Sequence, residues 1–189
     1  MVISVIAVLA LQFLGVNQAD TVTPTKKHQY IKTQYAGNIG FVSIGTGYEY
    51  KRTSIDLSYG YLPKLVNGVR VHTLSLRPKV HFGQFVISRV KSGFYFGAGI
   101  NYSFGRNIYG EIPNYYSIDY YWPNAFHLSP FLGGRVGFSS KKQKGKNVYL
   151  YSELGTVEYK IWYAMQNKKR IKPYDIWDIC FGMTIPLRK

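Results

Sequence analysis

Thr53-Ser54-Ile55-Asp56-Leu57-Ser58-Tyr59-Gly60-Tyr61 is a stretch in which apolar side chains alternate with small or charged ones. A period of two over this length predicts a β-strand whose two faces lie in different environments. The segment 94–104 repeats the pattern, with Phe, Ala, Ile and Tyr on one face and mainly Gly, Asn and Ser on the other. A membrane-spanning β-barrel requires this arrangement, because lipid surrounds its outer face and its lumen is polar and packed.

Eight segments of this kind are predicted, at residues 28–35, 39–50, 53–62, 70–82, 93–104, 125–139, 147–157 and 174–187. Their connections alternate between short basic turns and longer segments rich in tyrosine, glycine and proline, as in outer-membrane barrels. The predicted fold is therefore all-β, a closed antiparallel eight-stranded up-and-down transmembrane barrel with both termini on the periplasmic side. Segment 83–92 is too long and too apolar for a short turn, which leaves open that one or both flanking strands extend into it.

A soluble β-sandwich is the rival fold, and the outward positions of the fifth and eighth strands distinguish the two. A sandwich would carry Lys, Glu and Thr at those positions. This chain carries Phe94, Phe96, Ile100, Trp177, Ile179 and Phe181. The barrel is therefore the preferred interpretation.

The N-terminal segment predicts export. Residues 1–16 are nearly all apolar, yet too few to span a bilayer, which takes about 20 residues. Asn17-Gln18-Ala19 offers a cleavage site, so we expect a signal peptide over 1–19 and the barrel domain over 20–189. No Lys or Arg precedes the apolar core, as it normally does in a signal peptide; a mis-assigned start codon would explain this, and a buried helix or strand is the alternative. The expected location is the outer membrane of a Gram-negative bacterium.

The composition bears on partners and cofactors. The formal net charge of +15 would allow nucleic-acid binding, but the two densest basic groups lie between strands, and an exported chain meets little nucleic acid. We therefore expect outer-membrane lipids and lipopolysaccharide as partners, no nucleic acid and a monomer. Cys180 is the single cysteine, so no internal disulfide can form, and we expect it to be a small inward-facing strand residue. The four histidines lack metal-ligand spacing, and we expect neither a metal nor another cofactor.

The parity of the strands predicts which charges enter the lumen. Unpaired buried charges are costly, so these residues should form ion pairs that hold the barrel together, with Arg135 a partner for Glu153. The predicted lumen charge network comprises Glu49, Asp56, Arg77, Lys79, Arg135, Glu153 and Asp178.

One long connection is rich in aromatic residues. Tyrosine offers a large contact area at a low entropy cost, which favours binding at a surface, and an interfacial cap anchored in the lipid head groups is the alternative. The candidate residues for surface binding are Tyr109, Tyr115, Tyr116, Tyr120, Tyr121 and Trp122.

Several motifs are similar to those of known small barrels: Val71-His72-Thr73-Leu74-Ser75-Leu76-Arg77-Pro78, Tyr95-Phe96-Gly97-Ala98-Gly99-Ile100, Gly133-Gly134-Arg135-Val136-Gly137-Phe138 and the C-terminal Ile185-Pro186-Leu187. With these motifs the chain resembles small eight-stranded bacterial outer-membrane barrels, and loosely the lipid A deacylase type. That resemblance implies a lipid-facing esterase with a His-x-Ser pair on the seventh strand, where this chain has Tyr151-Ser152-Glu153.

The only usable His-x-Ser spacing is His127-Leu128-Ser129, on the sixth predicted strand and with lumen parity, and Glu153 could supply the orienting acid. We therefore expect a non-enzymatic barrel with a structural or surface-interaction role. A lipid A-type acyl ester hydrolase using His127, Ser129 and Glu153 is one alternative. A small pore is the other.

Overall fold

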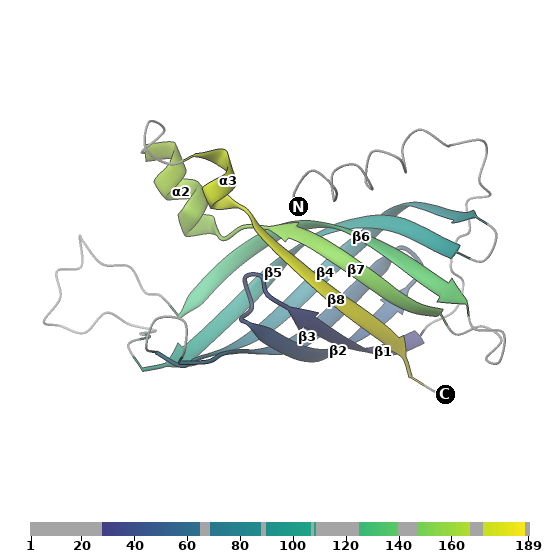
Figure 1. Ribbon diagram of the computed structural model, residues 1–189, viewed down its shortest axis with the longest axis horizontal. Coiled ribbons are helices and arrows are strands. Elements are labelled where there is room, and N and C mark those ends of the chain that lie inside the picture. The colour runs from purple at the N-terminus through teal and green to yellow at the C-terminus, as the bar shows by residue number, and fades with distance from the viewer. Residues whose placement is uncertain are drawn as a thin grey trace, which may run out of the picture.

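Eight antiparallel strands close into a barrel in this computed structural model, which describes residues 28–64, 69–87, 90–106, 108, 125–139, 147–166 and 172–187. Each strand pairs with its neighbour in the sequence, and β1 pairs with β8 to close the sheet (Figure 1). The strands are β1 (His28–Tyr35), β2 (Val42–Tyr50), β3 (Thr53–Leu62), β4 (Val71–Ile87), β5 (Val90–Gly105), β6 (Phe126–Ser139), β7 (Asn147–Gly155) and β8 (Asp178–Pro186). The prediction of a closed, antiparallel, eight-stranded barrel is confirmed. The predicted signal peptide lies outside the described residues.

The up-and-down topology gives the barrel two different ends. The turns between β2 and β3, β4 and β5, and β6 and β7 lie at the end where β1 begins and β8 ends, which we call the terminal end. The other four connections lie at the opposite end, which we call the loop end. In Figure 1 the C-terminus marks the terminal end.

The predicted and observed boundaries differ most in β4 and β5. Both strands extend into segment 83–92, and only residues 88–89 separate them. The ladder shifts register between Phe82 and Phe85, where Gly83 has a φ of 55° that favours glycine. An irregular ladder hides the period of two, which is why this segment could not be assigned from the sequence.

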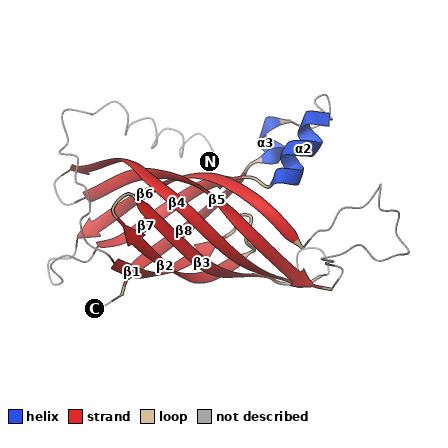
Figure 2. Ribbon diagram, turned by 180° about the vertical axis from the view of Figure 1, so that it is seen from behind, coloured by secondary structure: helices blue, strands red, loops and turns tan. Residues whose placement is uncertain are grey.

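Two short helices occupy the connection between β7 and β8, where a loop is predicted. They are α2 (Glu158–Gln166) and α3 (Pro173–Ile176), and they lie together at the loop end (Figures 1 and 2). Residues 174–177, predicted as the start of the last strand, therefore precede β8. Among the described residues no helix is long and apolar enough to cross a membrane.

The two faces of the wall differ as the alternation predicts. Side chains that point outward are large, apolar and exposed, among them Phe96, Ile100, Trp177, Ile179 and Phe181. Side chains that point inward are mostly polar or charged and buried, the reverse of a soluble protein. The soluble sandwich is therefore excluded by the fold.

Glycine and tyrosine form directly opposed cross-strand pairs inside the barrel. The pairs are Tyr30 with Gly47, Tyr95 with Gly133, Tyr149 with Gly137, and Tyr151 with Gly182. A Cβ atom added to any of these glycines would come closer than 3.0 Å to the ring of the opposed tyrosine. The glycines thus make room for aromatic rings that fill the narrow lumen.

Candidate functional site

The centre of the lumen holds a cluster of five fully or almost fully buried charged side chains. The Lys32 ammonium lies 3.1 Å from Asp56 and 3.3 Å from Glu153, so it bridges the two carboxylates. Lys79 is 2.6 Å from Asp56, and Arg77 is 2.8 Å from Glu153. Three cations thus share two carboxylates, and the cluster ties β1, β3, β4 and β7 together across the barrel.

Aromatic rings complete the environment of these charges. The Tyr30 hydroxyl donates a short hydrogen bond to Asp56, and the Tyr95 hydroxyl donates to Glu153 over 2.9 Å. The Lys32 ammonium lies 4.6 Å from the centre of the Tyr151 ring. Rings beside a buried cation offset part of the lost hydration, which suits a cluster with one more cation than carboxylates.

A second ion pair lies nearer the terminal end. Arg135 donates two hydrogen bonds to Glu49, at 2.6 and 2.8 Å, in the bidentate geometry that makes such pairs strong. The imidazole of His28 is 3.7 Å from the same carboxylate. This group leaves a cavity of about 20 Å³, lined also by Lys79 and His81. Such a volume holds about one water molecule.

Toward the loop end, three neutral lumen side chains form a chain of hydrogen bonds. Ser75 donates to the Asn101 side-chain oxygen over 2.5 Å, and the Asn101 amide donates to Ser129 over 2.7 Å. Ser129 in turn donates to the backbone oxygen of Gly99 over 3.4 Å. The hydroxyl of Ser129 is therefore engaged on both its donor and its acceptor side.

The structure divides six of the seven predicted lumen charges between two groups. Asp56, Arg77, Lys79 and Glu153 meet in the central cluster, whereas Glu49 and Arg135 form the separate pair. The predicted pair of Arg135 with Glu153 is wrong. Strand parity tells which face a side chain occupies, but not how far it reaches across the barrel.

Asp178 lies apart from both groups. It is partly exposed at the loop-end start of β8, where it pairs with Lys160 of α2 at 2.5 Å. Lys32, which bridges the central cluster, was not among the predicted lumen charges. Lys32 shares the parity of the buried residues Tyr30 and Gln34 in β1, and this signal could have identified it.

The three candidate catalytic residues do not converge. His127 bonds Glu158 at 3.0 Å, Ser129 bonds Asn101 and Gly99, and Glu153 belongs to the central cluster. A nucleophile, base and orienting acid must share one set of hydrogen bonds, which these residues lack. The pair of His127 with Glu158 resembles a base with its acid, but Ser129 has other partners.

We therefore expect Ser129→Ala to leave the lipid composition of the host membrane unchanged. The substitution removes two lumen hydrogen bonds, the one that Ser129 donates to Gly99 and the one that it accepts from Asn101, and should cost about 1–3 kcal/mol of stability. Mass spectrometry of extracted lipids from cells expressing either form checks the result, with equal amounts of folded barrel as the control. Loss of a lipid-modifying activity in Ser129→Ala would restore the esterase interpretation.

The remaining predictions concern the aromatic residues proposed for surface binding, Cys180 and metal binding. Tyr109, Tyr115, Tyr116, Tyr120, Tyr121 and Trp122 lie outside the described residues, so a binding role for them stays a prediction. Cys180 is buried, and its thiol lies 3.5 Å from Glu153. Within the described part of the chain no three His, Cys, Asp or Glu side chains are grouped so as to hold a metal ion.

Comparison with known proteins adds a likeness in fold. No family model matches the chain, and no curated protein matches it either. The chain is similar to the crystal structure of Neisserial surface protein A (NspA), with a TM-score of 0.42 and 12% sequence identity over 86% of this chain and 96% of that one. A likeness at this level carries no weight for the function of this chain, which rests on its own residues.

Proposed function

We propose that this chain is an integral outer-membrane barrel of a Gram-negative bacterium, with a sealed lumen and a structural or surface-interaction role. The observation that supports it is the inverted polarity of the wall, with exposed Ile44, Leu76 and Leu132 outside and buried Lys32 and Asp56 inside. In water such an exterior would drive aggregation, whereas in a bilayer it matches the surrounding acyl chains.

Aromatic residues near both rims of the wall support insertion in a bilayer. Near the terminal end, Tyr48 and Tyr50 are exposed, and near the loop end Tyr59 and Tyr102 are exposed. Tyrosine is favoured at the two boundaries between a membrane and water, since its ring is apolar and its hydroxyl is polar. The partners we propose are thus outer-membrane lipids and lipopolysaccharide, bound by a monomer.

The lumen favours a closed barrel over a pore. The central cluster and the tyrosine rings fill the interior, and the opposed glycines leave room for those rings. A filled interior is usual for eight strands. The role then rests on the outside of the barrel and on its loop-end connections, which would carry any surface interaction. A lipid esterase has less support, because His127 and Ser129 bond to different partners.

The protein should stay in the membrane when cells are extracted without detergent, and the refolded barrel should conduct no ions. We expect its mobility on a detergent gel to change on heating, because a barrel unfolds in detergent only when heated. In planar bilayers it should give no steady ion current. Extraction from cells as a soluble protein without detergent would contradict the membrane proposal, and a steady current would contradict the sealed lumen.

A further inference from the structure

Strand β6 extends beyond the end of β7, the strand that pairs with one of its two edges. β5 pairs with β6 as far as Tyr102 opposite Phe126, whereas β7 ends at Gly155 opposite Phe131. Residues 126–130 of β6 thus have no ladder partner on the β7 side. Unpaired backbone groups in a membrane are costly, so this edge needs another partner.

The start of α2 supplies that partner. The Leu128 amide donates to one carboxylate oxygen of Glu158 over 2.7 Å, and the other oxygen lies 3.0 Å from the His127 ring. Just before α2, the Thr156 amide donates to the Pro130 oxygen over 3.1 Å. Glu158 therefore replaces the missing strand and holds the beginning of α2 against the edge of β6.

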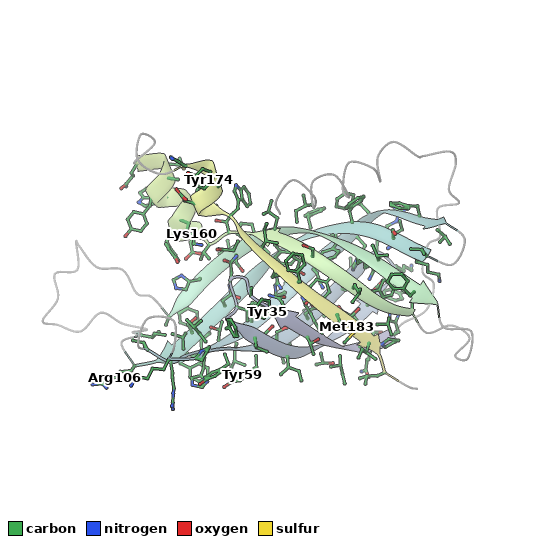
Figure 3. The ribbon with its side chains drawn as sticks, in the orientation of Figure 1. Tyr35, Tyr59, Arg106, Lys160, Tyr174 and Met183 are labelled. Atoms are coloured by element: carbon green, nitrogen blue, oxygen red, sulfur yellow. The ribbon has the colours of Figure 1, made fainter. Side chains whose placement is uncertain are left out.

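Further contacts fix the helix pair beside the barrel. The Tyr159 ring lies 5.4 Å from the His127 ring, and Lys160 pairs with Asp178 at the start of β8. The Thr156 hydroxyl donates to the Ile176 oxygen at the end of α3 over 2.8 Å. Figure 3 shows Lys160 and Tyr174 on this helix pair, at the loop end of the barrel.

α2 is anchored to the wall but buries none of its residues. Ile161, Trp162 and Met165 share one face of the helix by their spacing, and Trp162 and Met165 are 58% and 63% exposed. For a helix of a soluble domain, such a face would have to pack against a core. Within the described residues no element covers it.

The apolar surface of α2 continues that of the neighbouring wall. On β6, Phe126 and Leu128 point outward and are exposed, and Trp177 and Ile179 are exposed at the start of β8. These strands are the ones to which Glu158 and Lys160 tie the helix. The exposed apolar residues of α2 are therefore held beside strands whose outward residues are also apolar and exposed.

We propose that α2 is an interfacial membrane helix, with Ile161, Trp162 and Met165 seated at the boundary between lipid head groups and acyl chains on the loop side. This inference rests on the proposed membrane insertion of the barrel. Trp and Tyr favour this depth, and a short helix with one apolar face binds it in the plane of the membrane. Lys172, beside the Tyr174 ring, supplies a cation near the level of anionic head groups.

The lipid occupant is favoured over a protein partner by continuity with the wall. A protein partner would have to cover an apolar helix face that is tied to two strands of the lipid-facing wall. Lipid covers both parts at once. A helix held in the interface also fixes the depth of the barrel, because Glu158 couples it to β6.

The three tryptophans of the chain allow a direct test. A variant with Trp122→Phe and Trp177→Phe reports only Trp162, and one with Trp122→Phe and Trp162→Phe reports only Trp177. Each is refolded into phosphatidylcholine and phosphatidylglycerol vesicles that carry bromine either near the head group or near the chain end. We expect bromine near the head group to remove most of the Trp162 emission and bromine near the chain end to remove less.

Two further variants test the apolar face in the Trp162 reporter. Met165→Glu should reduce the quenching of Trp162, because it places a charge on the face that meets lipid. Ala164→Glu adds the same charge to the same helix at a position two residues from Trp162, which does not share a face with it, and should leave the quenching unchanged.

The two reporters separate the possible failures. Quenched Trp177 with unquenched Trp162 would overturn the interfacial helix and leave the membrane barrel standing, with water or a protein partner beside α2. If neither is quenched in a correctly folded barrel, the membrane insertion itself is wrong. Equal quenching of Trp162 in Met165→Glu and Ala164→Glu would also overturn the assignment of the apolar face.

Discussion

Asp56→Asn is expected to destabilise the folded barrel by about 3–5 kcal/mol, because breaking one side of a buried ion pair leaves the other charge uncompensated. Asp56 is fully buried and accepts from Lys32, Lys79 and Tyr30. Asparagine has nearly the same shape, so the loss reports the missing charge rather than a cavity. The buried Lys79 ammonium would then lose its carboxylate partner, and the buried Lys32 ammonium would keep only Glu153.

Asp178→Asn is the matched control for this prediction. It removes the same charge from a carboxylate with one lysine partner, Lys160, where Asp56 has two, and both side chains of this pair are partly exposed. Exposed pairs of this kind contribute about 1 kcal/mol at most. Urea titrations of both variants in detergent, followed by the heat-dependent gel mobility, give the two free energies of unfolding.

A second substitution tests the electrostatic cause. Lys79→Met removes the ammonium that Asp56→Asn leaves without a carboxylate partner, whereas Lys32 keeps Glu153, so the double variant should recover part of the lost stability. If Asp56→Asn unfolds at the same urea concentration as Asp178→Asn, the central cluster does not hold the barrel together.

The strands of the barrel wall were predictable because the period of two along the sequence determines which residues face outward and which face the lumen. β3 was predicted at its observed bounds, since Ile55, Leu57 and Tyr59 alternate with polar residues without interruption. β4 and β5 were predicted too short, because the shifted register near Gly83 interrupts that period. The regular part of a barrel is thus readable from the sequence, and its irregular ends are not.

The lumen contacts were only partly predictable. Parity does not give the position of a residue along the barrel axis, nor how far its side chain extends across the lumen. Arg135 faces Tyr151 across the ladder, and Glu153 faces Gly133, two residues away. Parity alone allows an Arg135–Glu153 pair, but the long arginine side chain crosses the lumen to Glu49 on β2. Cross-lumen distances depend on strand tilt and stagger, which no local pattern encodes.

Helix α2 was missed because a loop was expected wherever the alternation stopped. Its residues Glu158, Lys160, Ala164, Met165 and Gln166 are good helix formers, and Glu158 is a favourable first-turn residue. The segment 158–166 therefore carried a helical signal. The position of the helix depends on the uncovered edge of β6, which appears only once the strands are paired.

Gly133 and Gly134 offer a test of the packed lumen within one strand. Gly133 faces inward against the Tyr95 ring, and an added Cβ would lie closer than 3.0 Å to that ring. Gly134 faces outward, where an added Cβ would meet the Phe94 ring at 3.6 Å, an ordinary contact. The two positions thus share a strand and a residue type and differ in the face they occupy.

Gly133→Val is expected to cost about 3 kcal/mol or more, because overpacking displaces Tyr95 and breaks its hydrogen bond to the Glu153 carboxylate. Gly134→Val should instead be neutral or stabilising by about 0.5–1 kcal/mol, since glycine inside a strand loses more conformational freedom on folding. Urea titrations of the two variants measure the difference. In Gly133→Val, further truncation of the ring by Tyr95→Ala should recover part of the loss, because it removes the clash. Equal stability of Gly133→Val and Gly134→Val would mean that the lumen is loosely packed, which would contradict the proposed sealed barrel.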